Sequence, residues 1–242
     1  MLLIGLGHRA RQGKDLAAES IRNYYDAKNA ASLMHVASWK GSVRVGVFKY
    51  ATALYQEVNE WLKQTEDFGK VLGMKYYVTG PKVQSTADWV TGNLILELPE
   101  WVQPEPNAVK SELAPYGKHP KLLQWWGTEF RRQYFGQDYW IKKLFATIPG
   151  NLHIALISDM RFLDEAAAIK ERGGYTVNVQ RLNTDGTQYY APDRPKYHRS
   201  ETELDGYNYD YFIKSKEGSQ ALTGEYAITL AEYLKALNER KQ

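Results

Sequence analysis

The first residues of the chain place two glycines and several basic side chains between an apolar run and a helix-forming segment. The stretch LLIGLGHRARQGKD (2–15) starts with aliphatic residues, turns through Gly7 and Gly13, and ends on Lys14 and Asp15. Backbone N–H groups at a helix N-terminus bind anions, and a lysine at that point reaches the β- and γ-phosphates of a nucleotide. This spacing therefore favours phosphate binding.

The loop departs from the usual phosphate-loop pattern at two positions. Counting back from Lys14, the expected first glycine falls on His8, and Asp15 stands where a serine or threonine normally holds Mg²⁺. His8 then requires either a positive φ or a loop that is one residue longer. Asp15 either reaches the metal through a water molecule or caps the helix. An ordinary strand–turn–helix is the alternative, although Arg9, Arg11 and Lys14 would repel one another without a polyanion.

Composition narrows the class of protein. The 242 residues include no cysteine and carry a net charge of +3. Without cysteine there is no disulfide framework, thiolate metal site or catalytic thiol. No apolar stretch approaches the roughly 18 residues of a membrane span, and the charge is too small for an obligate nucleic-acid binder. We expect a soluble, cytoplasmic globular protein with no membrane partner.

Apolar patterning predicts strands that alternate with helices. Strands are expected at 2–6, 33–36, 152–159, 175–182 and 209–215, and helices at 14–28, 43–63, 122–134, 138–147, 164–172 and 223–237, the last capped by Thr223. This alternation predicts an α/β fold with parallel strands, right-handed crossovers and helices on both faces of the sheet. The proline-rich segment 65–120 is expected to be an insertion, and 181–201 a mobile loop.

Four further stretches, read together with the Gly-Lys-Asp ending of the first loop, carry a family resemblance. They are LLQWWGTEFRRQYFGQDYWIKKLF (122–145), LISDMRFLDEAAAIKERGG (156–174), the strand into Arg181, and HRSETELDGYNYDYFIKSKEGS (198–219). In this order and spacing they resemble the bacteriophage deoxynucleoside monophosphate kinases and, more distantly, the phosphomevalonate kinases. The resemblance covers roughly residues 1–40 and 122–242 and is weak or absent across 65–120.

The resemblance implies a single P-loop kinase domain of the nucleoside monophosphate kinase type. Such a domain has a five-stranded parallel sheet flanked by helices, here with an acceptor-binding segment at 65–120 and a lid-like loop at 181–201. It transfers the γ-phosphoryl group of ATP, with Mg²⁺, to the phosphate of a (deoxy)nucleoside monophosphate. Its partners are these nucleotides; a homodimer is left open, no stable nucleic-acid partner is expected, and a phage-encoded enzyme would work in the host cytoplasm.

The resemblance also assigns roles to individual residues. ATP would be bound by Gly7, His8, Arg9, Arg11, Gln12, Gly13, Lys14, Asp15 and Arg181, with Asp15 holding Mg²⁺ through water. The acceptor would be bound by Lys40, Trp125, Arg131, Arg132, Asp159 and Arg161. The catalytic residues would be Lys14, Arg131, Asp159 and Arg161, and the lid arginines Arg181, Arg194 and Arg199. Arginines suit this chemistry because phosphoryl transfer depends on positioning and charge neutralisation, and their planar fork grips phosphate oxygens.

Some of these residues also have structural interpretations. Arg131 with Arg132 could form a solvated helix face, Arg161 could pair with Asp164 or Glu165, and Trp125 with Trp126 could be core residues. His198 and Glu201 are more typical of residues that fix the last loop.

Two other functions stay open. One keeps the fold with another phosphorylated small-molecule acceptor, as in phosphomevalonate kinase. The other is a non-enzymatic nucleic-acid-binding module that uses Arg9, Arg11, Arg131, Arg132, Arg194 and Arg199 together with tyrosines.

Overall fold

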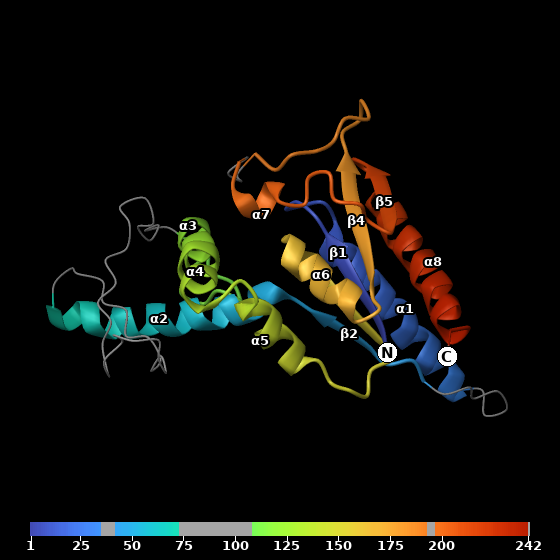
Figure 1. Cartoon of the computed structure of the whole chain (residues 1–242), viewed down its shortest axis with the longest axis horizontal. Helices are drawn as coiled ribbons and strands as arrows, with labels where there is room; N and C mark the ends of the chain where they lie inside the picture. Colours follow the sequence, from blue (N-terminus) through green and yellow to red (C-terminus); the bar gives the residue numbers. More distant parts are fainter. Residues whose placement is uncertain (35–41, 73–107, 193–196, 242) are drawn as a thin grey trace. The chain divides into compact units, whose positions relative to one another are not determined.

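The computed structural model describes residues 1–34, 42–72, 108–192 and 197–241 (Figure 1). Packing divides the chain into two compact units: Met1–Tyr50 together with Ile141–Gln242, and Ala51–Trp140. The expected insertion at 65–120 falls inside the second unit, and its residues 73–107 lie outside the described part of the chain.

The first unit contains a five-stranded parallel sheet, which confirms the expected α/β class. The strands are β1 (Leu2–Gly7), β2 (Val45–Phe48), β3 (Ile154–Met160), β4 (Tyr175–Leu182) and β5 (Tyr211–Lys216), in the order β2-β3-β1-β4-β5. The central strand β1 pairs with β3 on one side and with β4 on the other. Its six residues are aliphatic or glycine and all are buried, which suits a strand that is covered on both faces.

The strand order determines which face of the sheet α1 (Lys14–Met34) and α6 (Leu163–Glu171) of the first unit cover. The other helices of this unit are α7 (Arg199–Thr202) and α8 (Gln220–Glu239), together with most of α5 (Tyr139–Thr147). α1 leads from β1 to β2, whereas α6 leads from β3 to β4 in the opposite direction along the sheet. Because crossovers are right-handed, α1 and α6 cover opposite faces, and α8 packs beside α1 (Figure 1).

The strand order creates a topological switch at the carboxyl ends of β1 and β3. Open α/β sheets bind their ligands at such a point. The loop 8–13 follows β1 there, and Arg161 follows β3. The fold therefore brings the basic loop 8–13 and Arg161 to the same edge of the sheet.

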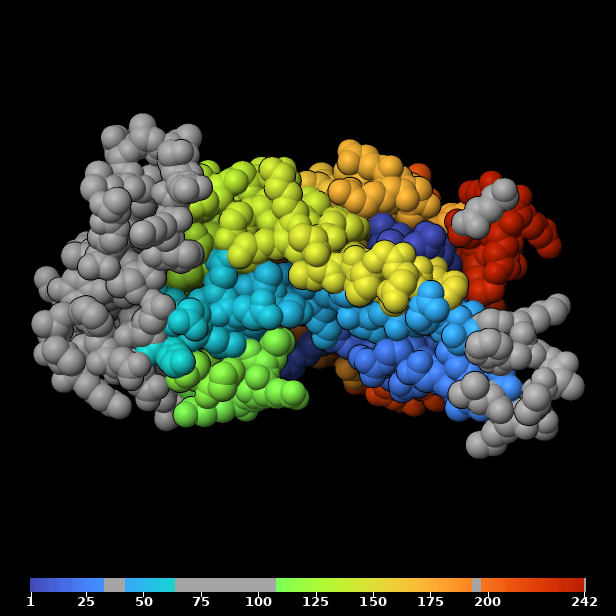
Figure 2. All heavy atoms as spheres, turned by 90° about the horizontal axis from the view of Figure 1, so that it is seen from below, coloured from blue at the N-terminus to red at the C-terminus, as the bar shows by residue number. Residues whose placement is uncertain are grey.

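Alternation along β1 divides its side chains between the two faces. Leu2, Ile4 and Leu6 belong to the core cluster that also contains buried residues of α1 and α8. Gly5 faces α6, where an added Cβ would lie 2.3 Å from Ile169 Cδ1. The outward side chains of α1 are visible in blue in Figure 2.

The second unit is helical in its described part. It contains α2 (Tyr50–Leu72) after its first residue, α3 (Pro120–Gln124), a π-helical stretch Trp125–Arg132 and α4 (Gln133–Phe135). The expected helix at 122–134 is thus confirmed as a continuous helical segment, with a wider turn in its middle. Trp125 and Phe130, five residues apart, stack with ring centroids at 5.3 Å; the wide π-helical turn accommodates this contact.

The second expected strand is wrong as placed. α1 continues to Met34, so the described part of 33–36 is helical. The strand instead occupies Val45–Phe48, at the start of the expected helix 43–63, where Val45 aligns with Ile154 of β3. Apolar residues of a short run fit a strand as well as a helix, and pairing with β3 decides between them.

Two boundaries near the C-terminus also differ. The expected loop 181–201 begins inside β4 and ends in α7. α8 begins at Gln220, so Thr223 is not a cap: it is buried in the helix, and its hydroxyl contacts that of Ser215. Among the described residues, none of the helices combines the length and apolar character that crossing a bilayer requires.

We expect the substitution Gly174→Ala to destabilise the first unit by about 1–3 kcal/mol, the usual cost of overpacking. A Cβ there would lie 2.9 Å from two backbone oxygens, those of Leu3 and Ile169, and neither can move aside cheaply. Urea unfolding measures the change. Gly150→Ala is the control, because a Cβ at Gly150 meets nothing within 4 Å; equal stability of the two variants would contradict the prediction.

Candidate functional site

The loop 8–13 joins β1 to α1 with positive φ angles near its end. Gly13 has a φ of 96° and Arg11 a φ of 56°. The positive φ that was one alternative for His8 is therefore found at Arg11. This favours the other alternative, a loop that starts at Gly7 and is one residue longer than usual. Glycine is required at position 13 because a side chain is disfavoured at such a φ.

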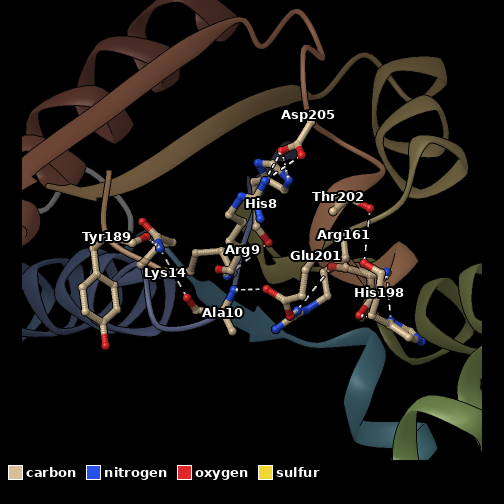
Figure 3. Close-up of polar contacts among 12 residues, drawn as sticks. His8, Arg9, Ala10, Lys14, Arg161, Tyr189, His198, Glu201, Thr202 and Asp205 are labelled. Carbon is tan, nitrogen blue, oxygen red and sulfur yellow. Dashed lines mark hydrogen bonds and ion pairs between the residues drawn. The ribbon is translucent and has the colours of Figure 1, made fainter. Parts of the chain in front are cut away.

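Lys14 begins α1 and turns its ammonium group back into the loop. Nζ donates to the carbonyl oxygen of Arg9 and lies 3.5 Å from that of His8 (Figure 3). Burial lowers the pKa of Lys14 to about 7, and the charge of Arg161 acts in the same direction. In the described part of the chain, the ammonium is thus held by backbone carbonyls and has no carboxylate partner at ion-pair distance.

Asp15 lies beside Lys14 and contacts a residue of β3 and a residue just after β2. Its Oδ1 is 2.8 Å from Lys49 Nζ, just after β2, and accepts a hydrogen bond of 2.9 Å from Ser158 Oγ of β3. Burial alone would raise the pKa of Asp15, but the hydrogen bonds from Lys49 and Ser158 lower it. Next to Ser158, Asp159 Oδ1 accepts a 2.8 Å hydrogen bond from the backbone N–H of Tyr50.

Glu201 connects α7 to both basic motifs. One carboxylate oxygen accepts a 2.9 Å hydrogen bond from the backbone N–H of Ala10, and the other accepts one from Arg161 Nη1 (Figure 3). Burial alone would raise the pKa of Glu201, but the Arg161 charge and the Ala10 N–H lower it. The alternative pairing of the Arg161 guanidinium with Asp164 or Glu165 is not observed; Glu165 instead accepts from the backbone N–H of Arg161.

The start of the loop is held by Asp205. Arg9 Nη2 lies 2.6 Å from both oxygens of this carboxylate, and its guanidinium lies 4.8 Å from the Tyr190 ring centroid. His8 Nε2 lies 3.2 Å from Asp205 Oδ1. Burial lowers the pKa of His8 to about 4, so the ring is neutral at pH 7. The contacts of Arg9 and His8 therefore hold the loop in place. Both side chains are buried and present little charge to solvent.

Gln12 ties the loop to β4 and to the segment after it. Its Oε1 accepts a 2.8 Å hydrogen bond from the backbone N–H of Arg181, and its Nε2 donates to Tyr189 at 2.9 Å. The Arg181 guanidinium pairs with Glu217 and lies 4.3 Å from the Tyr189 ring centroid. Arg199, the other described lid candidate, pairs with Glu203.

The second unit contains a separate charged network around Glu57. This carboxylate accepts hydrogen bonds from Arg131 Nε at 2.6 Å, from Trp126 Nε1 at 2.9 Å and from the Tyr139 hydroxyl. Arg131 is only 2% exposed and its guanidinium lies 4.6 Å from the Phe130 ring centroid. Within the described residues, its Nη2 has no hydrogen-bond partner.

The other expected acceptor residues of the second unit are also buried. Arg132 is 1% exposed and its Nη1 donates to Gln137 O at 2.7 Å, so a solvated Arg131–Arg132 face is excluded. Trp125 and Trp126 are both buried in the aromatic packing.

The structure brings together one group of expected site residues within the first unit, and the other group belongs to the second unit. Lys14, Asp15, Asp159 and Arg161 meet at the sheet edge of the first unit. Trp125, Arg131 and Arg132 belong to the second unit. Lys40 and Arg194 lie outside the described residues, and their roles stay predictions.

Sequence reasoning missed several partners of these residues. Lys49, Ser158, Asp205 and Glu57 were not expected at a site, and Glu201 was expected only to fix a loop. Lys49 was recoverable in principle, because it directly follows the strand that pairs with β3. Asp205 and Glu57 carry no local signal, since their partners lie far away in the sequence.

A bound Mg²⁺ ion would find oxygen donors at this edge of the sheet. The described residues contain no group of three or more histidine or acidic side chains placed to hold a metal. Mg²⁺ in nucleotide sites commonly uses only one or two protein ligands, with phosphates and water for the rest. Asp15 and Ser158 supply a carboxylate and a hydroxyl oxygen of this kind.

Comparisons with known proteins add no assignment: no protein-family model matches the chain, and no curated protein sequence matches it.

The lowered pKa of Lys14 should make stability depend on pH. A lysine whose folded-state pKa lies below its unfolded value destabilises the protein below pH 7, and this penalty fades as pH rises. The free energy of unfolding of the unsubstituted protein, minus that of Lys14→Met, should therefore rise by roughly 2 kcal/mol from pH 7 to pH 9. Urea unfolding at both values tests this, and a constant difference would mean that Lys14 titrates outside this range.

The Glu57 network gives a second prediction. Glu57→Gln leaves the Arg131 charge buried without its carboxylate, so we expect a loss of about 3–5 kcal/mol in the free energy of unfolding. Adding Arg131→Met should recover most of it, because no unpaired charge then remains. If the double variant is as unstable as the single one, the charge pair is not the cause.

Proposed function

We propose that the chain is an ATP-dependent kinase that phosphorylates a (deoxy)nucleoside monophosphate to the diphosphate. The observation that carries this proposal is the buried ammonium of Lys14, held by carbonyls of a loop between a central parallel strand and a helix. A buried cation without an anion is unfavourable. A triphosphate that approaches the start of α1 would supply the missing negative charge, with help from the helix dipole.

The neighbours of Lys14 support the same chemistry. The side chain of Arg161 is one-quarter exposed, and its charge acts on Lys14. Glu201 takes one terminal nitrogen, and the planar fork has further donors for phosphate oxygens. Arg161 is the residue we assign to stabilising the transferred group.

ATP would supply the phosphoryl group, and Mg²⁺ would neutralise part of its charge. Lys14 and the N–H groups of the loop would bind the phosphates, while Asp15 would hold the metal's water shell. Asp159, which already orients the backbone at Tyr50, would position the acceptor side. The role expected of Arg131 at the acceptor phosphate stays a prediction, because its guanidinium is buried against Glu57 and the aromatic rings of the second unit.

The choice of acceptor rests on the family resemblance of the motifs. A phosphorylated acceptor without a base, as in phosphomevalonate kinase, would use the same Lys14 and Arg161. The nucleic-acid-binding alternative is disfavoured, because Arg9, Arg131 and Arg132 are at most 9% exposed and cannot form a surface for a strand.

A coupled assay of ADP release should show ATP turnover only when a suitable monophosphate is present. All ribo- and deoxyribonucleoside monophosphates, and phosphomevalonate, serve as candidate acceptors. Lys14→Met and Arg161→Ala should each lower kcat/KM by about 10²-fold or more, the loss expected for a transition-state donor. Arg22→Ala, on the outer side of α1 and paired only with Glu19, is the control and should keep full activity.

Turnover with phosphomevalonate and with none of the nucleotides would show that the acceptor is a phosphorylated molecule without a base. Absence of turnover with every acceptor, or full activity of both variants, would refute the proposal.

A further inference from the structure

The loop 8–13 and Arg161 come from different strands, and one short segment joins them. Glu201 in α7 binds the backbone N–H of Ala10 and the guanidinium of Arg161 with its two carboxylate oxygens. Asp205, just after α7, binds Arg9 in the same loop. α7 and the turn after it therefore fasten both halves of the candidate phosphate site (Figure 3).

We propose that Glu201 is a positioning residue, which holds Arg161 at a fixed distance from the phosphate loop so that both can contact one polyphosphate. The inference rests on the proposed function, since it assigns Glu201 a task within that site. A guanidinium on a loop has several rotamers, and a misplacement of about 1 Å can cost about 10²-fold in rate. A carboxylate that is also fixed to the Ala10 amide removes this freedom.

Burial and available donors support positioning over mere charge balance. Glu201 is 5% exposed, so its carboxylate is locked between two partners. Arg161 spends one terminal nitrogen on it, with Ser200 O at 3.4 Å from the same nitrogen. Among the described residues, Glu201 engages only the Nη1 atom of Arg161, so Nε and Nη2 are the nitrogens left for a ligand.

Glu201 also acts on Lys14 through space. The charges that face Lys14 are those of Arg161 after β3, Asp159 in β3, Asp15 in α1 and Glu201 in α7. Glu201 favours the protonated ammonium, whereas Arg161 disfavours it. Glu201 therefore lies where its charge acts on both cations of the candidate site, Lys14 and Arg161.

The test compares Glu201→Gln with Asp210→Asn. Asp210 is a matched control, because its carboxylate also joins a backbone N–H, that of Thr176, to a cation, Lys170. Inorganic tripolyphosphate is the probe, titrated by calorimetry at pH 8. We expect Glu201→Gln to bind it about tenfold more weakly. Asp210→Asn should bind it as the unsubstituted protein does.

A steady-state measurement separates positioning from binding. Glu201→Gln should lower kcat by roughly 10–10²-fold, because Arg161 contributes most in the transition state. Tripolyphosphate affinity and kcat equal to those of the unsubstituted protein would overturn the inference while leaving the proposed function intact. Failure of the unsubstituted protein to bind tripolyphosphate or turn over ATP would instead remove the proposed function, and the inference with it.

The competing role for Glu201 is that of an internal anion which phosphate must displace. Tighter tripolyphosphate binding by Glu201→Gln would establish that role and overturn ours. The same question can be asked without a variant, by amide hydrogen exchange at Ala10. Positioning predicts that the Ala10 N–H stays protected when tripolyphosphate is added, and loss of protection would contradict it.

Discussion

Among the residues that the structure describes, the first unit buries the positive charge of Lys14 with no carboxylate at ion-pair distance. Lys14 donates to backbone carbonyls of its own loop, and burial brings its pKa to about 7. Keeping such a group buried costs folding stability. The cations around it are neutralised differently: Arg9 by Asp205, Lys49 by Asp15 and Arg161 by Glu201. Among these cations, Lys14 is therefore the one whose charge an external anion would neutralise.

The strand order explains why these charges meet. β1 and β3 are neighbours whose following segments leave in opposite directions, so the loop 8–13 and Arg161 begin side by side at the same end of the sheet. Ser158 at the end of β3 then reaches Asp15 at the start of α1. The charged edge is thus a consequence of topology. Gly5 contributes to it, because a glycine there allows α6 to pack closely against β1, the strand that leads into the loop.

Much of this edge follows from local patterns, because a strand, a glycine turn and a lysine are contiguous in the sequence. The same holds for Asp159 and Arg161, which lie at the end of β3 and just after it. What local patterns cannot supply is pairing between distant segments. β2 was expected to be helical because four residues do not distinguish the two periods. Glu57 was unremarkable as a helix residue until folding placed Arg131, Trp126 and Tyr139 around it.

The two arginines expected to act on phosphate are held in different ways, and this difference bears on function. Arg131 is enclosed by aromatic rings and by Glu57, so its orientation is fixed by packing within its own unit. Arg161 lacks such a cage; it stands at a loop and is restrained by the carboxylate of α7. An enzyme that brings two polyanions together needs cations that are rigid yet partly unsatisfied. Packing provides that rigidity for Arg131, and for Arg161 the carboxylate of Glu201 is the group that can provide it.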